Sequence, residues 1–170
     1  MSESEERKQS EGFEVGTRSV EMSLTEQVHL VAPPDLNSYD RLFGGRLMQW
    51  IDEVAGIAAI RHCGGHVTTA AVDNLQFKAG ANCADLVVLR ARLTWVGNSS
   101  MEVRVDTYVE DSSGERIPIN RAYLVEVAIG PDGKPTHVPR LGLSSPEQYA
   151  EWENGVRRQQ LRRQRREEGF

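Results

Sequence analysis

The chain has 170 residues, of which 39% are hydrophobic and 26% are charged, a balance that suits one compact domain with a sizeable core. It excludes a membrane-embedded protein and a chain disordered throughout, and no apolar run approaches the roughly 18 residues of a membrane span. The formal net charge of -5, from 20 basic and 25 acidic residues, argues against general nucleic-acid binding.

Residues 1–20 hold five glutamates and few apolar side chains. We expect a disordered acidic tail there, and its first ten residues lack the apolar stretch of a signal peptide. The chain has only two cysteines, Cys63 and Cys83, too few for a disulfide scaffold. Together these features predict a cytoplasmic protein with reduced thiols.

A strand is predicted over residues 22–31, and Pro33-Pro34 ends it. Gly44-Gly45 then opens an apolar-rich segment that Cys63-Gly64-Gly65 closes, which predicts a helix over residues 44–62. Few polar residues interrupt this run, so we expect the helix to be buried.

Four further runs predict strands, with turn residues between them: 67–78, 86–96, 101–110 and 117–129. In the second run one face is formed by Val87, Leu89, Leu93 and Trp95. The third run alternates most regularly, with one face formed by Met101, Val103, Val105, Thr107 and Val109. Such alternation is typical of a half-buried strand.

Consecutive strands joined by short turns predict an antiparallel sheet, against which the preceding helix must bury its apolar side. We therefore expect an α+β domain over residues 21–145, with a curled antiparallel sheet wrapped around a long central helix. Ser144-Ser145-Pro146-Glu147 is typical of a helix start, so residues 146–170 are predicted to form a C-terminal helix and an arginine-rich tail. That tail is either a solvated charged helix or a binding segment for phosphate groups.

Asp52 is the first candidate catalytic residue. With about 100° between successive helix residues, Arg46, Gln49 and Glu53 form one polar strip. Asp52 lies apart from that strip, among small and apolar side chains. A carboxylate in such surroundings either reaches a neighbouring backbone N–H group or arginine, or it performs chemistry.

Gly44-Gly45 and Asn37 are the other candidates. Free N–H groups at a helix start suit an anionic oxygen, either of a phosphate or of the oxyanion formed in acyl transfer. The alternative for the glycines is a tight turn. Asn37 has an amide that can orient a water or donate to a carbonyl, and the alternative is an ordinary turn residue.

The remaining polar residues and motifs give weaker indications of a functional site. Asp73 shares a strand face with apolar neighbours, so we expect it to be half-buried in structural hydrogen bonds. His62 and His66 flank a Gly-Gly turn beside Cys63, but no second cluster has ligand-like spacing, so no metal site is predicted. The glycine patterns of hydrolase elbows, Walker loops and dinucleotide-binding loops are missing from the sequence.

The segment from Asn37 to Glu53, with Phe43-Gly44-Gly45 and Asp52, resembles the signature of the hotdog-fold acyl-CoA thioesterases, the acyl-CoA hydrolase family. The likeness continues through residues 67–77, residues 96–103 and the Val138-Pro139-Arg140 segment. It implies the hotdog fold and the hydrolysis of fatty acyl-CoA to a free acid and coenzyme A. It also implies a homodimer as the minimal active unit, with three dimers in a hexamer.

The resemblance implies roles for the candidate residues. Asp52 acts as general base or nucleophile and faces Asn37 of the partner subunit, which places the water or the thioester. The N–H group of Gly44 or Gly45 binds the thioester oxygen. Coenzyme A is part of the substrate, so no cofactor is expected. The nucleotide of the substrate is expected at a subunit interface, near Lys78, Ser99, Ser100, Arg158 and Arg162.

Other functions stay open at this point. One is a non-catalytic protein that binds or senses acyl-CoA with the same fold, and another is a purely structural assembly domain. A dehydratase of this fold lacks a suitably placed histidine beside the helix carboxylate. The chain departs from the family pattern at Asp40 and Ala84, where many relatives carry Gly, and at Ala79, where Pro is common; we expect these changes to affect the substrate rather than the fold.

Overall fold

The computed structural model describes residues 16–170, so most of the expected acidic tail lies outside the described residues. The predicted end of that tail at residue 20 is wrong. Thr17–Ser19 forms strand β1, which pairs in parallel with β7 (Arg140–Gly142), and the short 3-10 helix η1 (Val20–Ser23) follows. The reason is that Val20 is an apolar residue with a place in the core, where it is 4% exposed.

Five antiparallel strands form the main sheet, in the order β2-β4-β5-β6-β3. Their bounds are β2 Thr25–Leu30, β3 His66–Phe77, β4 Leu86–Val96, β5 Ser100–Glu110 and β6 Arg116–Ile129. The four longer strands and the central helix α2 (Gly44–Cys63) agree with their predictions to within a residue. The first predicted strand begins later than expected because η1 precedes it, and the 3-10 helix η2 (Pro33–Asp35) follows it.

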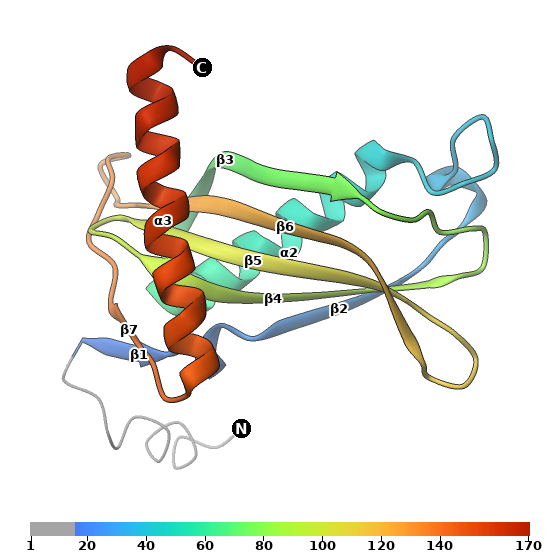
Figure 1. The fold of residues 1–170 in the computed structure, drawn as a ribbon, viewed down its shortest axis with the longest axis horizontal. Coiled ribbons are helices and arrows are strands. Elements are labelled where there is room, and N and C mark those ends of the chain that lie inside the picture. Colours follow the sequence, from blue (N-terminus) through green and yellow to red (C-terminus); the bar gives the residue numbers. More distant parts are fainter. Residues whose placement is uncertain (1–15) are drawn as a thin grey trace.

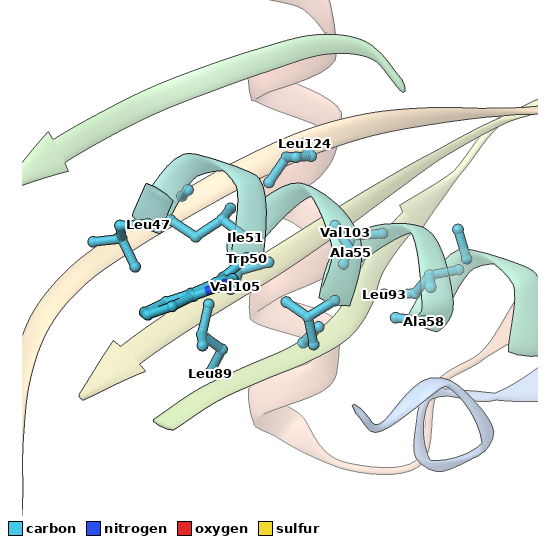
Figure 2. Close-up of a cluster of buried hydrophobic side chains, with 14 of the residues drawn as sticks. Leu47, Trp50, Ile51, Ala55, Ala58, Leu89, Leu93, Val103, Val105 and Leu124 are labelled. Atoms are coloured by element: carbon cyan, nitrogen blue, oxygen red, sulfur yellow. The ribbon is translucent and has the colours of Figure 1, made fainter. Parts of the chain in front are cut away.

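Helix α2 lies along one face of the sheet, and its apolar side builds the core (Figure 1). Figure 2 shows this cluster, in which α2 contributes Leu47, Trp50, Ile51, Ala55 and Ala58, and the sheet contributes Leu89, Leu93, Val103, Val105 and Leu124. The helix ends where Gly64 adopts the left-handed conformation, with φ of 72°, and donates its N–H to the carbonyl of Ile60. This arrangement confirms the predicted α+β fold. No helix within residues 16–170 is long and apolar enough to cross a membrane.

A second long helix, α3 (Pro146–Glu168), crosses the opposite face of the sheet, and its C-terminal end projects beyond β3 (Figure 1). It begins where Ser145 accepts a hydrogen bond from the Gln148 N–H. It also covers the side of β5 that the alternation left polar, so Glu102 is fully buried and Asp106 is 6% exposed. Strand β5 is therefore buried on both faces rather than on one.

The prediction that Trp95 shares a face with Val87, Leu89 and Leu93 is wrong, because those three residues lie in the core and Trp95 does not. The register of β4 against β5 shifts between Leu93 and Trp95, and such a shift turns the following side chains to the other face. The Trp95 ring therefore lies toward α3, where its centroid is 6.2 Å from that of Trp152.

Gly155 sets how closely α3 approaches the sheet, because a Cβ atom there would lie 2.8 Å from the Cβ of Trp95. We expect Gly155→Ala to lower the free energy of unfolding by about 1–3 kcal/mol, since the helix has to move outward. Gly65→Ala is the control, because a Cβ at that glycine meets nothing within 4 Å. Urea unfolding compares the two variants, and equal stability would contradict the close approach.

Candidate active site

Asp52 projects from α2 toward β3. Its Oδ1 accepts a hydrogen bond of 2.7 Å from the Thr69 hydroxyl. The side chain is exposed in the single chain, so the expectation that small and apolar neighbours enclose it is wrong. The reason is that β3 is the outermost strand, and no further strand covers this side of α2. Within residues 16–170, Asp52 hydrogen-bonds neither a backbone N–H group nor an arginine.

Glu126 is a second carboxyl group at this place, and it was not predicted from the sequence. It lies opposite Thr69 in the β3–β6 ladder, and its Oε1 is 3.1 Å from the Thr69 hydroxyl oxygen. Its side chain is fully buried. The pKa of Glu126 is raised to about 7, mainly by burial, and the charge of Asp52 contributes to this rise. The sequence does contain a signal for this group, because Glu126 lies on the same face of its strand as Leu124 and Ala128, which are buried.

The start of α2 provides the expected free N–H groups. The first helical hydrogen bonds run from the N–H groups of Arg46 and Leu47 to the carbonyl of Phe43. The N–H groups of Gly44 and Gly45 thus have no hydrogen-bond partner in the described part of the chain. Gly44 lines a cavity of about 370 Å³ at this end of the helix.

Asn37 lines the same cavity from the preceding loop. Its Oδ1 accepts hydrogen bonds from the N–H groups of Tyr39, at 2.9 Å, and Arg41, at 3.3 Å, as a turn residue does. Its Nδ2 group has no partner among residues 16–170 and is available to a ligand. No contact joins Asn37 to Asp52 within the described chain, so these two candidates do not form one site in a single subunit.

The residues expected near the nucleotide of coenzyme A are also separated. Lys78 lines the cavity beside Gly44, and its N–H donates to the carbonyl of Ile119. Ser99 lies in the turn between β4 and β5, and Ser100 begins β5, where it pairs with Val127 at the opposite end of β6. A single chain does not bring these groups together.

Arg158 and Arg162 lie within α3 and form ion pairs with the sheet. Arg158 contacts Glu102 at 2.8 Å and Glu151 at 2.9 Å, and its guanidinium lies 3.7 Å from the centroid of the Tyr123 ring. Arg162 contacts Glu102 at 2.7 Å and Asp73 at 3.3 Å. These contacts give both arginines a structural part in this chain, and they also bear out the expected structural bonding of Asp73.

Strand β3 has one edge without a neighbouring strand in the sheet. Large apolar side chains are exposed on β3, on the adjoining part of α2 and at the residue just before α2: Phe43 at 55%, Met48 at 43%, Val72 at 45% and Phe77 at 51%. A long edge strand with exposed apolar side chains is a template for pairing with another chain. The uncovered carboxylate of Asp52 lies on this same side.

Comparison with known proteins agrees with this geometry. Residues 39–114 match the family model described as the thioesterase superfamily. The chain is 37% identical to the uncharacterized acyl-CoA thioester hydrolase YkhA of Bacillus subtilis, over 88% of each chain. The chain belongs to the acyl-CoA thioester hydrolase family. It is also 33% identical to the cytosolic acyl coenzyme A thioester hydrolase of Rattus norvegicus, although it spans only 37% of that protein's length.

Solved structures of this family have the same fold. An apo-hexameric acyl-CoA thioesterase superposes with a TM-score of 0.84 at 35% identity, covering 88% of this chain and 96% of the other. The acyl-CoA hydrolase of Staphylococcus aureus, solved in complex with butyryl coenzyme A and coenzyme A, gives a TM-score of 0.84 at 32% identity, covering 89% and 93%. Three further structures of that hydrolase each have alanine in place of one residue: an asparagine, an aspartate or a threonine.

The ion pairs of Arg158 generate a stability prediction. We expect Arg158→Leu to lower the free energy of unfolding by about 3 kcal/mol, because it removes a cation from the fully buried Glu102. Arg163→Leu is the control on the same helix, since Arg163 is 72% exposed and pairs only with Glu167. Chemical denaturation measures both, and similar small losses would contradict a buried ion pair.

The raised pKa of Glu126 predicts how stability depends on pH. The unfolded chain releases this proton near pH 4.5 and the folded chain only near pH 7, so the wild type loses about 3 kcal/mol of stability as the pH rises through this window. Glu126→Gln cannot ionise. We therefore expect it to exceed the wild type in stability at pH 8 and to match it near pH 4.5. Denaturation at the two pH values checks this, and a difference independent of pH would refute it.

Proposed function

We propose that this protein hydrolyses acyl-CoA thioesters to a free acid and coenzyme A, with Asp52 as general base. The observation that carries the proposal is the hydrogen bond from Thr69, which holds a carboxylate at an exposed position on the uncovered side of α2. The three residues substituted in the Staphylococcus aureus hydrolase stand in the same order and at the same spacings as Asn37, Asp52 and Thr69. Family membership supports the class of reaction.

The reaction needs an activated water and a place for negative charge. Asp52 removes a proton from the water as its oxygen attacks the thioester carbonyl carbon. The carbonyl oxygen becomes an oxyanion, held by the N–H group of Gly44 or Gly45 of the partner subunit, since Gly44 lines the same cavity as Asn37. The intermediate then expels the coenzyme A thiolate as the C–S bond breaks, and the proton on Asp52 returns to that thiolate. Asn37 of the partner subunit orients the water or the thioester through its amide nitrogen.

Direct attack by Asp52 on the thioester is the alternative mechanism. It produces an anhydride, and in water labelled with 18O the label enters the Asp52 carboxylate when water attacks the aspartyl carbonyl of that anhydride. The general-base mechanism leaves the carboxylate unlabelled. Label found at Asp52 by mass spectrometry after a single turnover would therefore establish the anhydride.

The proposed site requires two copies of the chain, because Asn37 and Asp52 do not meet in one. The free edge of β3 and the apolar side chains beside it provide a surface for a second copy. We expect three such dimers in a hexamer, in keeping with the hexameric relatives. The nucleotide of the substrate then lies between subunits, near Lys78, Ser99 and Ser100, and the rat relative described as cytosolic supports a cytoplasmic location.

We expect Asp52→Asn to lower kcat/KM for acyl-CoA by about 10²–10⁴-fold, because the amide cannot accept the proton from water. Glu53→Gln is the control, since Glu53 is the adjacent exposed carboxylate on α2 and bonds to Gln49. Release of free thiol from acyl-CoAs of varied chain length measures the rate. Absence of turnover in the wild type, or full activity in Asp52→Asn, would overturn the assignment, and binding without turnover would instead favour an acyl-CoA sensor.

The partner arrangement has its own test. Asn37→Ala and Asp52→Asn chains are each expected to be nearly inactive, but a mixed dimer contains one intact site if the two residues act across the subunits. Random mixing of the two chains then restores about a quarter of the wild-type activity. If both residues acted within one chain, the mixture would stay inactive.

A further inference from the structure

The Thr69 hydroxyl lies between two carboxyl groups. Its oxygen is 2.7 Å from Asp52 Oδ1 on one side and 3.1 Å and 3.4 Å from the two oxygens of Glu126 on the other. The contacts join α2, β3 and β6, because Thr69 and Glu126 are partners in the β3–β6 ladder and Asp52 faces β3 from the helix. The three side chains form a line from the exposed carboxylate into the core.

The single hydrogen of the Thr69 hydroxyl limits the hydrogen bonds that these three side chains can form. A hydroxyl has a single hydrogen to donate and otherwise only accepts. The shorter contact, to Asp52, assigns the Thr69 hydrogen to that carboxylate. The contact with Glu126 is then a hydrogen bond only if Glu126 has a proton of its own to donate to the Thr69 oxygen.

The surroundings of Glu126 favour the protonated form. Its side chain is fully buried, and Thr69 is its only hydrogen-bond partner within residues 16–170. From β5 the facing residue is the buried Met101, and its neighbours on β6 with the same orientation are Leu124 and Ala128. The charged group that faces it is Asp52 of α2, which is negative and disfavours a second negative charge.

Glu102 shows the opposite case in the same sheet. It is also fully buried, but it faces α3 and forms ion pairs with Arg158 and Arg162. Those cations compensate the burial of a charged carboxylate. Glu126 has no arginine, lysine or histidine within hydrogen-bond distance among residues 16–170. A proton is therefore what satisfies Glu126.

We propose that Glu126 is a positioning residue: its protonated carboxyl donates to the Thr69 hydroxyl, which donates in turn to Asp52 and holds that carboxylate in place. This inference rests on the proposed function, in which Asp52 is the base. When Glu126 ionises, two carboxylates compete for the single Thr69 hydrogen, and a second negative charge lies close to the developing oxyanion. The wild type therefore loses activity as the pH rises through about 7.

The first experiment compares pH profiles of kcat/KM for the wild type, Glu126→Gln and Glu126→Leu. The amide of Gln donates to Thr69 at every pH, so we expect Glu126→Gln to stay within about threefold of the wild type at pH 6 and to exceed it by about 3- to 10-fold at pH 8.5. Leu has no hydrogen to donate, so Glu126→Leu is expected to be slow at both pH values. A ratio of Glu126→Gln to wild type that does not change with pH would overturn the proposal, since a purely structural role has no such dependence.

The second experiment needs no turnover. Infrared difference spectra between pH 5.5 and pH 8.5 are expected to show a protonated carboxyl band that disappears with a midpoint near pH 7 and is missing in Glu126→Gln. Asp52→Asn removes the nearby negative charge and is expected to lower that midpoint. Absence of the band in the wild type, or the same midpoint in the wild type and Asp52→Asn, would overturn the proposal.

The two experiments separate two kinds of failure. A wild type without acyl-CoA turnover, but with a Glu126 band that shifts as expected, would refute the proposed function and leave the proton at Glu126 established. Normal turnover that depends on Asp52, together with an unprotonated Glu126 at pH 5.5, would refute the positioning role alone.

Discussion

The burial of one side of α2 against the sheet is the constraint on which the rest of the structure depends. Ile51, Val54 and Ala55 are at most 1% exposed, and they fix the rotation of the helix about its axis. A close-packed interior leaves little freedom to change that rotation. Asp52 follows Ile51 directly, so its direction toward β3 is a consequence of hydrophobic packing. Core packing thus sets the position of Asp52 on the helix, and the Thr69 hydrogen bond fixes the orientation of its carboxylate.

The two faces of the sheet solve the same electrostatic problem in different ways. Each face buries a glutamate completely, Glu102 under α3 and Glu126 under α2. A buried carboxylate is costly unless a cation or a proton compensates it. On the α3 side the compensation is by arginines, and these ion pairs also join the helix to the sheet. On the α2 side it is by a proton, which places a titratable group beside the candidate catalytic carboxylate.

Strand β3 connects the candidate chemistry to assembly. It provides Thr69 to the site, and Asp73, four residues further along the strand, pairs with Arg162 and Arg165 of α3. Its outer edge has no neighbouring strand, and α3 projects past it (Figure 1). The candidate residues therefore lie on an incomplete side of the domain. A second copy at this edge would cover the apolar side chains and bring another loop with its Asn37 to the same region.

The sequence by itself determined the elements and the candidate groups that depend on local chemistry. Alternation of apolar residues gave strands β3 to β6, and Gly64 ended α2, because side-chain periodicity and backbone conformation are local properties. Asp40 and Ala84, two departures from the expected family pattern, are left-handed here, with φ of 56° and 69°. These departures thus concern backbone conformation.

Only the tertiary structure decided which of these groups meet. Glu126 stands at a core position in an ordinary strand, and nothing local shows that Thr69 and Asp52 lie beside it. Trp95 faces α3 because one bulge reverses the sides of β4, and Arg158 lies against Glu102 because a helix distant in sequence crosses the sheet. Contacts between distant segments depend on how whole elements pack, and a pattern along the chain records periodicity but not which surfaces come together.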